Sequence, residues 1–173
     1  MRIAVSGTHY TGKTTLIEDL IRELPNYEII EEPYYQLEER GYQFAYPPSL
    51  EDFERQFLFS LQSIKGSGEN VFLDRSPLDF IAYALSIEKA FSFDLNSWLN
   101  QAMNALAKLE LILFVPIDNS ISVPKSENNQ LRFDVDERLR EMLIDDCFSL
   151  DLNVMEVTGT RQERVKTVLR YLL

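Results

Sequence analysis

The sequence predicts a three-layer α/β fold in which a five-stranded parallel sheet carries helices on both faces. Two observations predict it. Short apolar runs alternate along the chain with longer segments that have apolar residues at helical spacing, and strands that alternate with helices form parallel sheets covered on both faces. Glycines, carboxylates and hydroxyls also follow the apolar runs directly. Because parallel sheets bind ligands at the carboxyl ends of their strands, these residues are expected to share one site.

The expected elements follow from the two periodicities. The predicted strands are apolar runs of five to eight residues, at 2–6, 27–32, 70–74, 110–117 and 153–159. The predicted helices are the longer amphipathic segments, at 13–24, 49–65, 77–90, 94–109, 134–150 and 160–173. Ser49 with Asp52 is an acidic variant of the N-terminal capping pair, and Ser76 followed by Pro77 is a second helix start.

Length and charge bound the class of protein. A chain of 173 residues fits one domain, 1–173, with a core of ordinary size. A net charge of −11 without a long Lys/Arg run argues against a nucleic-acid partner. No apolar run approaches the ~20 residues of a membrane span, and "MRIAVSG" at the start has no hydrophobic signal region. We therefore expect a cytoplasmic protein with no membrane partner.

Two further residues bear on compartment and assembly. Cys147 is the single cysteine, so an intramolecular disulfide is impossible, in keeping with a reducing compartment. Its apolar helical context, "MLIDDCFSL", favours a small buried core residue over a nucleophile. Trp98 fits equally a core position or the face of a homodimer.

The segment "GTHYTGKT" at 7–14 matches G-x-x-x-x-G-K-[ST], with an apolar strand before it and an amphipathic helix after it. Its glycines let the backbone curl so that N–H groups point at phosphate oxygens, and the helix adds its positive end. Lys13 is expected to reach the β- and γ-phosphates, and the Thr14 hydroxyl to bind Mg²⁺. The predicted site for ATP and Mg²⁺ comprises Gly7, Thr8, His9, Tyr10, Thr11, Gly12, Lys13, Thr14 and Thr15.

His9 is the one histidine and lies between the two glycines of this loop. The cradle uses main-chain donors, so this position tolerates many side chains, which favours a histidine that faces solvent or packs beside the nucleotide. The alternative is a direct contact with the acceptor or the transferred phosphate. Tyr10 is a candidate wall of an acceptor pocket.

Asp74 ends the strand 70–74, where a carboxylate can hold Mg²⁺ directly or through water. Capping the next helix is the alternative role, but Ser76 is the better cap and leaves Asp74 for the metal. Arg75 follows at once. In a chain of net charge −11 this placement favours a phosphate or substrate ligand, with a surface ion pair as the alternative.

Glu31 and Glu32 precede Pro33 at the end of the second predicted strand. Proline keeps the residue before it extended, which fixes Glu32 at the strand tip. A carboxylate there can align an acceptor hydroxyl or take its proton. Side chains alternate along a strand, so only one of the pair can face the site. We assign this role to Glu32, with a solvated acidic pair as the alternative.

Together, "GTHYTGKTT", "EEP" and "DRS", in this order, resemble the P-loop kinases of nucleosides and nucleotides, especially the deoxynucleoside kinase and thymidylate kinase branch. The resemblance implies a P-loop NTPase fold and ATP- and Mg²⁺-dependent transfer of the γ-phosphate to a small-molecule acceptor. It implies that Glu32 lies near the acceptor and that Asp74 and Arg75 act at the phosphates. "FERQFLF" is similar to the helix with a base-reading glutamine, which implies that Gln56 binds the acceptor.

The resemblance also implies a lid at 118–133 that supplies arginines to the transferred phosphate. This region and the helix after it offer Lys125, Arg132, Arg138 and Arg140, without a full arginine-rich pattern. Arg132 and Arg138 are the preferred catalytic candidates. Arg140 falls ~200° round the helix from Arg138, so both cannot face the site.

"VTGTRQERV" resembles the loop on which such kinases rest the adenine base. The resemblance implies base contacts from Thr158, Gly159, Thr160 and Arg161. A plain strand-to-helix turn capped by Thr160 fits the sequence equally well.

The favoured function is therefore a kinase that phosphorylates a nucleoside or nucleotide. Nicotinamide riboside kinases and other small-metabolite kinases share the loop and sheet, which leaves the acceptor open. The alternative is a non-kinase module that binds ATP, hydrolyses it slowly and signals through conformation. A GTPase is disfavoured because neither "NNQL" nor "IDNS" supplies an N-K-x-D guanine-reading stretch.

Overall fold

A computed structural model of the chain describes all residues except 88–92, 119–120, 122 and 124–128. Five parallel strands form one sheet in the order β2-β3-β1-β4-β5. Their bounds are Arg2–Ser6 for β1, Glu28–Ile30 for β2, Val71–Asp74 for β3, Leu111–Phe114 for β4 and Val154–Glu156 for β5. The predicted five-stranded parallel sheet is thus confirmed.

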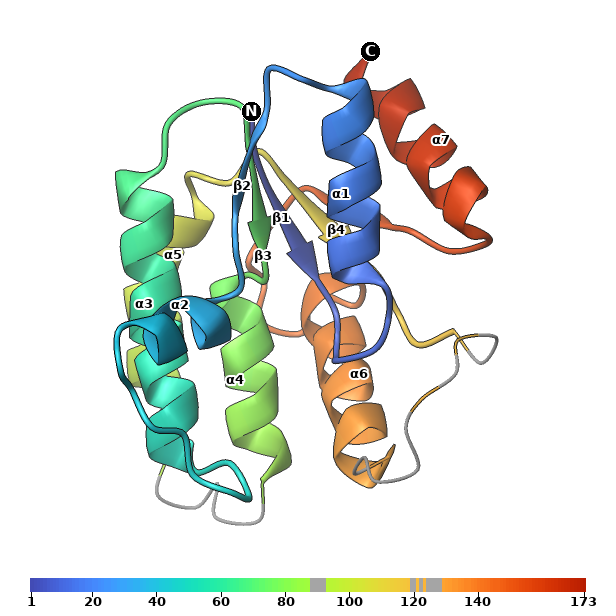
Figure 1. Cartoon of the computed structure of the whole chain (residues 1–173). Coiled ribbons are helices and arrows are strands. Elements are labelled where there is room, and N and C mark those ends of the chain that lie inside the picture. Colours follow the sequence, from blue (N-terminus) through green and yellow to red (C-terminus); the bar gives the residue numbers. More distant parts are fainter. Residues whose placement is uncertain (88–92, 119–120, 122, 124–128) are drawn as a thin grey trace.

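Helices cover both faces of this sheet (Figure 1). Helices α1 (Lys13–Glu23) and α7 (Arg161–Leu172) lie on one face. The other face carries α3 (Leu50–Gly66), α4 (Pro77–Ser86), α5 (Leu95–Leu106) and α6 (Asn129–Leu143). A short helix, α2 (Pro33–Glu39), follows β2 and contacts α3. The predicted three-layer architecture is confirmed.

The alternation of strand side chains divides the core into two layers. In β1, Ile3 and Val5 pack toward α1 and α7, whereas Ala4 packs toward α3–α6. In β3, Phe72 belongs to the first layer and Leu73 to the second. The three central strands, β1, β3 and β4, are therefore buried on both faces, which explains their continuous apolar runs, whereas the edge strands β2 and β5 are partly exposed.

Some predicted bounds were wrong. Helix α2 was not expected, and the helix predicted at 134–150 runs from Asn129 to Leu143. The chain cannot continue this helix because Asp146 has a φ of +47°, and its carboxylate accepts the backbone N–H of Leu150 at 2.6 Å. Cys147 lies beyond the helix and is exposed, which corrects its expected place in the core. The end of the helix predicted at 77–90 falls partly outside the described residues.

The two helix starts predicted at Ser49 and Ser76 are confirmed. Ser49 and Ser76 each form a capping box with an aspartate three residues later. Trp98 is 6% exposed and stacks on Phe57 with ring centroids 4.4 Å apart, so it belongs to the core. Within the described residues, none of the helices has both the length and the apolar character needed to cross a membrane.

Candidate active site

The phosphate loop connects β1 to α1 at the carboxyl edge of the sheet (Figure 1). A side chain at Gly7 would collide with the carbonyl oxygen of Val115, the residue after β4, so only glycine fits at this position of the loop. Gly12 has a φ of +88° and immediately precedes the first helical residue, Lys13. The loop therefore leads straight into the positive end of α1.

Lys13 and Thr14 sit at the start of α1 with their polar atoms turned into the loop. The Lys13 ammonium is buried and donates to the carbonyl of Thr8 at 2.9 Å. Its burial, with the charge of Arg75, lowers the pKa of Lys13. The Thr14 hydroxyl donates to Asp74 Oδ2 at 2.7 Å. These two residues lie where the motif predicts the contacts to phosphate and metal.

Asp74 fits the predicted metal site. Its strand β3 pairs directly with β1, in register Val5 to Asp74, which places the carboxylate beside the loop. Asp74 is 4% exposed, and its Oδ1 has no hydrogen-bond partner among the described residues. Burial raises the pKa of Asp74. The hard oxygens of Asp74 and Thr14 are the donors that Mg²⁺ prefers, and a bound cation would satisfy the unpaired oxygen.

Arg75 joins the tip of β2 to the phosphate loop. Its Nε donates to Glu32, its Nη1 donates to the Gly7 carbonyl at 3.0 Å, and the same nitrogen lies 3.4 Å from Asp79 Oδ1. The arginine side chain is 5% exposed and the Glu32 side chain 18% exposed. The pair is thus a buried bridge, which excludes the alternative of a surface ion pair for Arg75.

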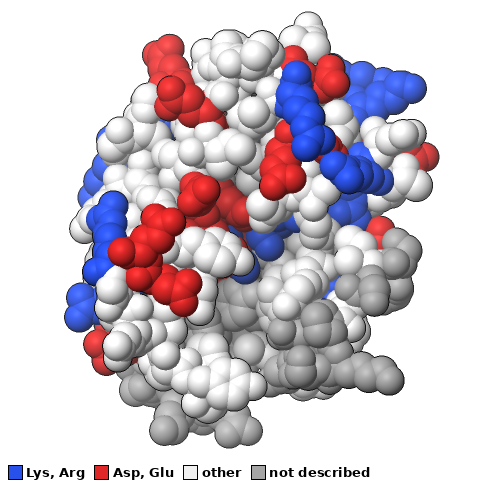
Figure 2. Space-filling model, viewed as in Figure 1, with Lys and Arg blue, Asp and Glu red and all other residues white. Residues whose placement is uncertain are grey.

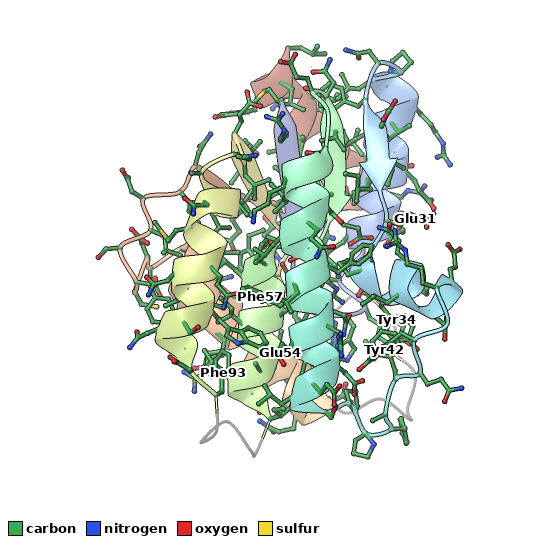
Figure 3. The ribbon with its side chains drawn as sticks, turned by 90° about the vertical axis from the view of Figure 1, so that its left-hand side faces the viewer. Glu31, Tyr34, Tyr42, Glu54, Phe57 and Phe93 are labelled. Atoms are coloured by element: carbon green, nitrogen blue, oxygen red, sulfur yellow. The ribbon has the colours of Figure 1, made fainter. Side chains whose placement is uncertain are left out.

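Glu32 forms one half of this bridge. Its neighbour Glu31 is exposed and lies at the outside of the β2 end (Figure 3). Glu32 is the N-cap of α2, with Pro33 as the first helical residue. Burial alone would raise the pKa of Glu32, but the charges of Arg75 and Lys13 outweigh it and hold the pKa below its usual value. Glu32 is therefore an ionised carboxylate beside the phosphate loop.

Two buried neighbours of the phosphate loop were not selected from the sequence. Asp79, fully buried in α4, accepts the Gly7 N–H at 3.0 Å and caps its own helix through Ser76. Tyr83, one turn further along α4, receives the His9 N–H at 3.1 Å and lies 2.8 Å from His9 Nδ1. The sequence did contain a signal for both: Asp79 stands at the capping-box position directly after "DRS", and Tyr83 stands one helical turn later.

His9 is held inside the site rather than projected into solvent. Beyond the contacts with Tyr83, its ring lies edge-on to Tyr10, with centroids 5.6 Å apart. Burial, with the charges of Arg75, Lys13 and Arg132, lowers the pKa of His9 to about 4. The imidazole is therefore neutral near pH 7, and its role is hydrogen bonding and packing rather than charge.

The basic residues of the predicted lid have different surroundings. Arg132, in the first turn of α6, is 4% exposed and donates to the carbonyls of His9 at 3.0 Å and Tyr10 at 3.2 Å. Arg138 is about half exposed and pairs with Glu141 at 3.0 Å on its own helix. Lys125 and much of the region 118–133 fall outside the described residues. Among the described candidates, Arg132 is the one that the structure brings to the loop.

Arg140 pairs with Glu156 of β5 at 2.6 Å. The central carbon of its guanidinium also lies over the Phe114 ring, 5.4 Å from the ring centroid. Arg140 thus joins α6 to the sheet, in agreement with the expectation that it and Arg138 point in different directions.

The segment after β5 forms the capped turn that the sequence allowed. Thr160 caps α7 by accepting the N–H of Glu163, and Gly159 has a φ of +93°. Arg161 is exposed and pairs with Asp19 of α1 at 2.5 Å. The base contacts expected of residues 158–161 stay a prediction. Arg164, which the sequence analysis did not select, is buried and donates to the carbonyls of Gly159 and Thr11.

Gln56 lies on the buried face of α3 and donates to the Asp52 carbonyl at 3.1 Å. One turn earlier, Phe53 stacks on Tyr83 with centroids 5.1 Å apart. This stack links the Gln56 face of α3 to the residues around His9. Figure 2 shows acidic and basic side chains interspersed over the upper part and the left edge of one face, and a smaller area of Lys and Arg atoms near its centre.

Solved structures with a similar fold include deoxyadenosine kinase from M. mycoides with bound dATP, at 16% identity and a TM-score of 0.70, covering 99% of both chains. Thymidylate kinase from Candida albicans matches at 16% identity and a TM-score of 0.65, covering 99% of this chain and 90% of that one. The NadR protein in complex with NR matches at 24% identity and a TM-score of 0.71, covering 98% of this chain and 50% of that one. The fold is that of the P-loop kinases of nucleosides and nucleotides.

A family model described as an AAA domain matches residues 2–164. The match spans the phosphate loop, Asp74, Arg75 and the first turn of α7. The chain belongs to this AAA domain family. No curated protein matches the sequence.

Proposed function

We propose that this protein transfers the γ-phosphate of Mg-ATP to a hydroxyl or phosphate of a small metabolite, with a nucleoside or nucleotide as the favoured acceptor. The observation that carries the proposal is the buried Arg75–Glu32 bridge at the phosphate loop. A protein that only binds ATP has no need of an ionised carboxylate on the far side of the loop. The activities named for two of the similar structures, deoxyadenosine kinase and thymidylate kinase, support the same class of reaction.

The residues divide the reaction between them. Lys13 leaves the Thr8 carbonyl to contact the β- and γ-phosphates of the donor. Thr14 and Asp74 would hold Mg²⁺, which neutralises the phosphate charge that develops during transfer. The protein contributes position and electrostatics rather than a covalent intermediate.

Glu32 orients the acceptor. Its Oε2 accepts no hydrogen bond from the described residues, while Oε1 is held by Arg75. An acceptor hydroxyl that donates to Oε2 would be aligned with the γ-phosphate, and the carboxylate can take its proton as the new P–O bond forms. Gln56 would contact the rest of the acceptor, and Arg138 remains a candidate for contact with the transferred phosphate.

The direct test follows ADP formation from Mg-ATP with and without each of a panel of nucleosides, nucleoside monophosphates and nicotinamide riboside. We expect ADP to form only when a suitable acceptor is present, and Lys13→Ala to abolish that formation. ADP formation that is the same with and without every acceptor would instead identify an ATP-hydrolysing module and reject the kinase.

A further inference from the structure

The outward carbonyl groups of the phosphate loop are bound by an unusual set of partners. Each of the five successive carbonyls of residues 7–11 accepts a hydrogen bond from a cationic side chain. Two of these cations belong to the expected machinery. Arg75 donates to the Gly7 carbonyl at 3.0 Å, and Lys13 donates to the Thr8 carbonyl at 2.9 Å.

The other two cations come from helices far along the chain. Arg132 of α6 spans two peptides, with Nε on the His9 carbonyl at 3.0 Å and Nη2 on the Tyr10 carbonyl at 3.2 Å. Arg164 of α7 completes the series, with Nη1 on the Thr11 carbonyl at 2.7 Å. We call these two side chains the carbonyl clamp.

Both arginines of the carbonyl clamp are buried, Arg132 at 4% and Arg164 at 5% exposure. Burying a guanidinium is unfavourable unless the site satisfies it. Arg164 is satisfied by the Gly159 carbonyl and by Asp118 at 3.0 Å, as well as by the loop. Among the described residues Arg132 makes no ion pair, and its guanidinium donates to the His9 and Tyr10 carbonyls of the loop.

The consequence for the loop follows from peptide geometry. In a trans peptide the N–H points away from the C=O of the same unit. Holding the carbonyls of residues 9–11 outward therefore turns the N–H groups of residues 10–12 toward the inside. The left-handed φ values of Tyr10, +57°, and Gly12, +88°, give the backbone the alternation of an anion-binding nest. No acceptor for the N–H of Thr11 or Gly12 is found among the described residues.

We propose that Arg132 and Arg164 are positioning residues that hold the phosphate loop in its anion-binding conformation before nucleotide arrives. Without either one, the freed peptide can rotate and present a carbonyl oxygen to the phosphates. The proposal rests on nucleotide binding at the proposed site and deepens it. It differs from a role for Arg132 as a ligand of the transferred phosphate.

Calorimetric titration of Arg132→Lys and Arg164→Lys with ATP, ADP and inorganic tripolyphosphate tests the clamp. Lysine keeps the charge but lacks the planar fork of donors. It therefore cannot replace Arg132, which binds two carbonyls, or Arg164, which binds two carbonyls and the Asp118 carboxylate. We expect each variant to bind all three ligands ~10- to 100-fold more weakly than the unmodified protein, because charge-assisted hydrogen bonds that order the loop are lost. Arg170→Lys, on the exposed face of α7, is the matched control and should bind like the unmodified protein.

Three outcomes would overturn the proposal. Unchanged affinity in both variants would show that the carbonyls need no clamp. A loss for ATP but not for ADP would make Arg132 a γ-phosphate ligand. A loss for ATP and ADP but not for tripolyphosphate would place the effect of Arg164 at the base. Should Arg164→Lys fail to fold by circular dichroism, Arg132→Lys carries the test. Transfer is not measured, so a chain that binds ATP but phosphorylates nothing would reject the kinase and leave this inference standing.

Discussion

The two halves of the candidate site are built differently. On the donor side, eight consecutive residues, 7–14, form a loop fixed by backbone contacts to buried cations. On the acceptor side, Glu32 and Gln56 come from separate elements, and the buried bridge to Arg75 ties Glu32 to the loop. This difference indicates that phosphate binding depends on the shape of the main chain, whereas the choice of acceptor depends on individual side chains.

The surroundings of the acceptor side are aromatic. Tyr34 of α2 stacks on Phe44 with centroids 4.2 Å apart, and Tyr42 meets the same ring edge-on at 4.8 Å. The Tyr42 hydroxyl donates to Asp52 of the α3 capping box at 3.0 Å. Figure 3 shows Tyr34 and Tyr42 on the same side of α3, below Glu31. These contacts hold α2 and the following segment against α3, beside the tip of β2.

The largest expected effect is the loss of turnover on replacing Glu32, a change that should affect the acceptor side and leave the donor side intact. Glu32→Gln should lower kcat by ~10²–10³-fold, because an amide neither takes the acceptor proton nor balances Arg75. Affinity for ATP should stay within about twofold, because the donor loop is unchanged. Steady-state kinetics and ATP titration measure the two quantities. Glu31→Gln, on the exposed neighbour, is the control; an equal loss in both variants, or an unchanged rate in Glu32→Gln, would remove Glu32 from the mechanism.

The next effect lies on the donor side, at the unpaired oxygen of Asp74. Asp74→Asn should raise the Mg²⁺ concentration for half-maximal turnover by ~10- to 100-fold, since the amide is a poorer ligand for a hard cation. A Mg²⁺ titration of the rate at saturating ATP measures it, with the exposed Asp145→Asn as the control. A Mg²⁺ requirement that does not move would place the metal elsewhere.

A smaller effect is expected at Gln56. Gln56→Ala should raise KM for the acceptor by about tenfold, the value of a lost hydrogen bond, and leave KM for ATP unchanged. Gln62→Ala, on the exposed face of the same helix, should change neither KM. If both substrates lose affinity in Gln56→Ala, the helix positions the whole site and Gln56 does not select the acceptor.

The smallest effect concerns pH and His9. The pKa of His9 is about 4 in the folded chain, against 6.5 for an unperturbed histidine, so the unfolded chain binds the proton first as pH falls. The contribution of His9 to stability is therefore complete above pH 6.5 and is lost as pH falls toward 4. Allowing for partial exposure, the free energy of unfolding should drop between pH 7 and 4.5 by about 1 kcal/mol more in the unmodified protein than in His9→Gln. Urea unfolding at both pH values measures this difference, and parallel losses would contradict it.

The sequence alone indicated which residues lie close to the phosphate loop along the chain, but not the contacts that reach the loop from distant helices, for a physical reason. The strands and the residues that follow each strand can be predicted from local periodicity, and the carboxyl ends of parallel strands share one edge, where Asp74, Arg75 and Glu32 were expected to meet. The carbonyl clamp could not be predicted, because Arg132 and Arg164 reach the loop from more than 100 residues away. Helix α2 was missed because "EEP" was interpreted as a strand end, although Pro33 also begins a helix. Cys147 was misplaced because the turn at Asp146 interrupts an apolar helical pattern.

The destination of the γ-phosphate tests the central claim most directly. The protein is incubated with ATP labelled at the γ-phosphate, Mg²⁺ and the acceptor that supports the fastest ADP formation, and the label is divided between acceptor and inorganic phosphate. The pairing of a phosphate loop with an ionised Glu32 predicts that most of the label reaches the acceptor, and that Glu32→Gln loses this product. Label found in inorganic phosphate, at the same rate with and without acceptor, would contradict the account.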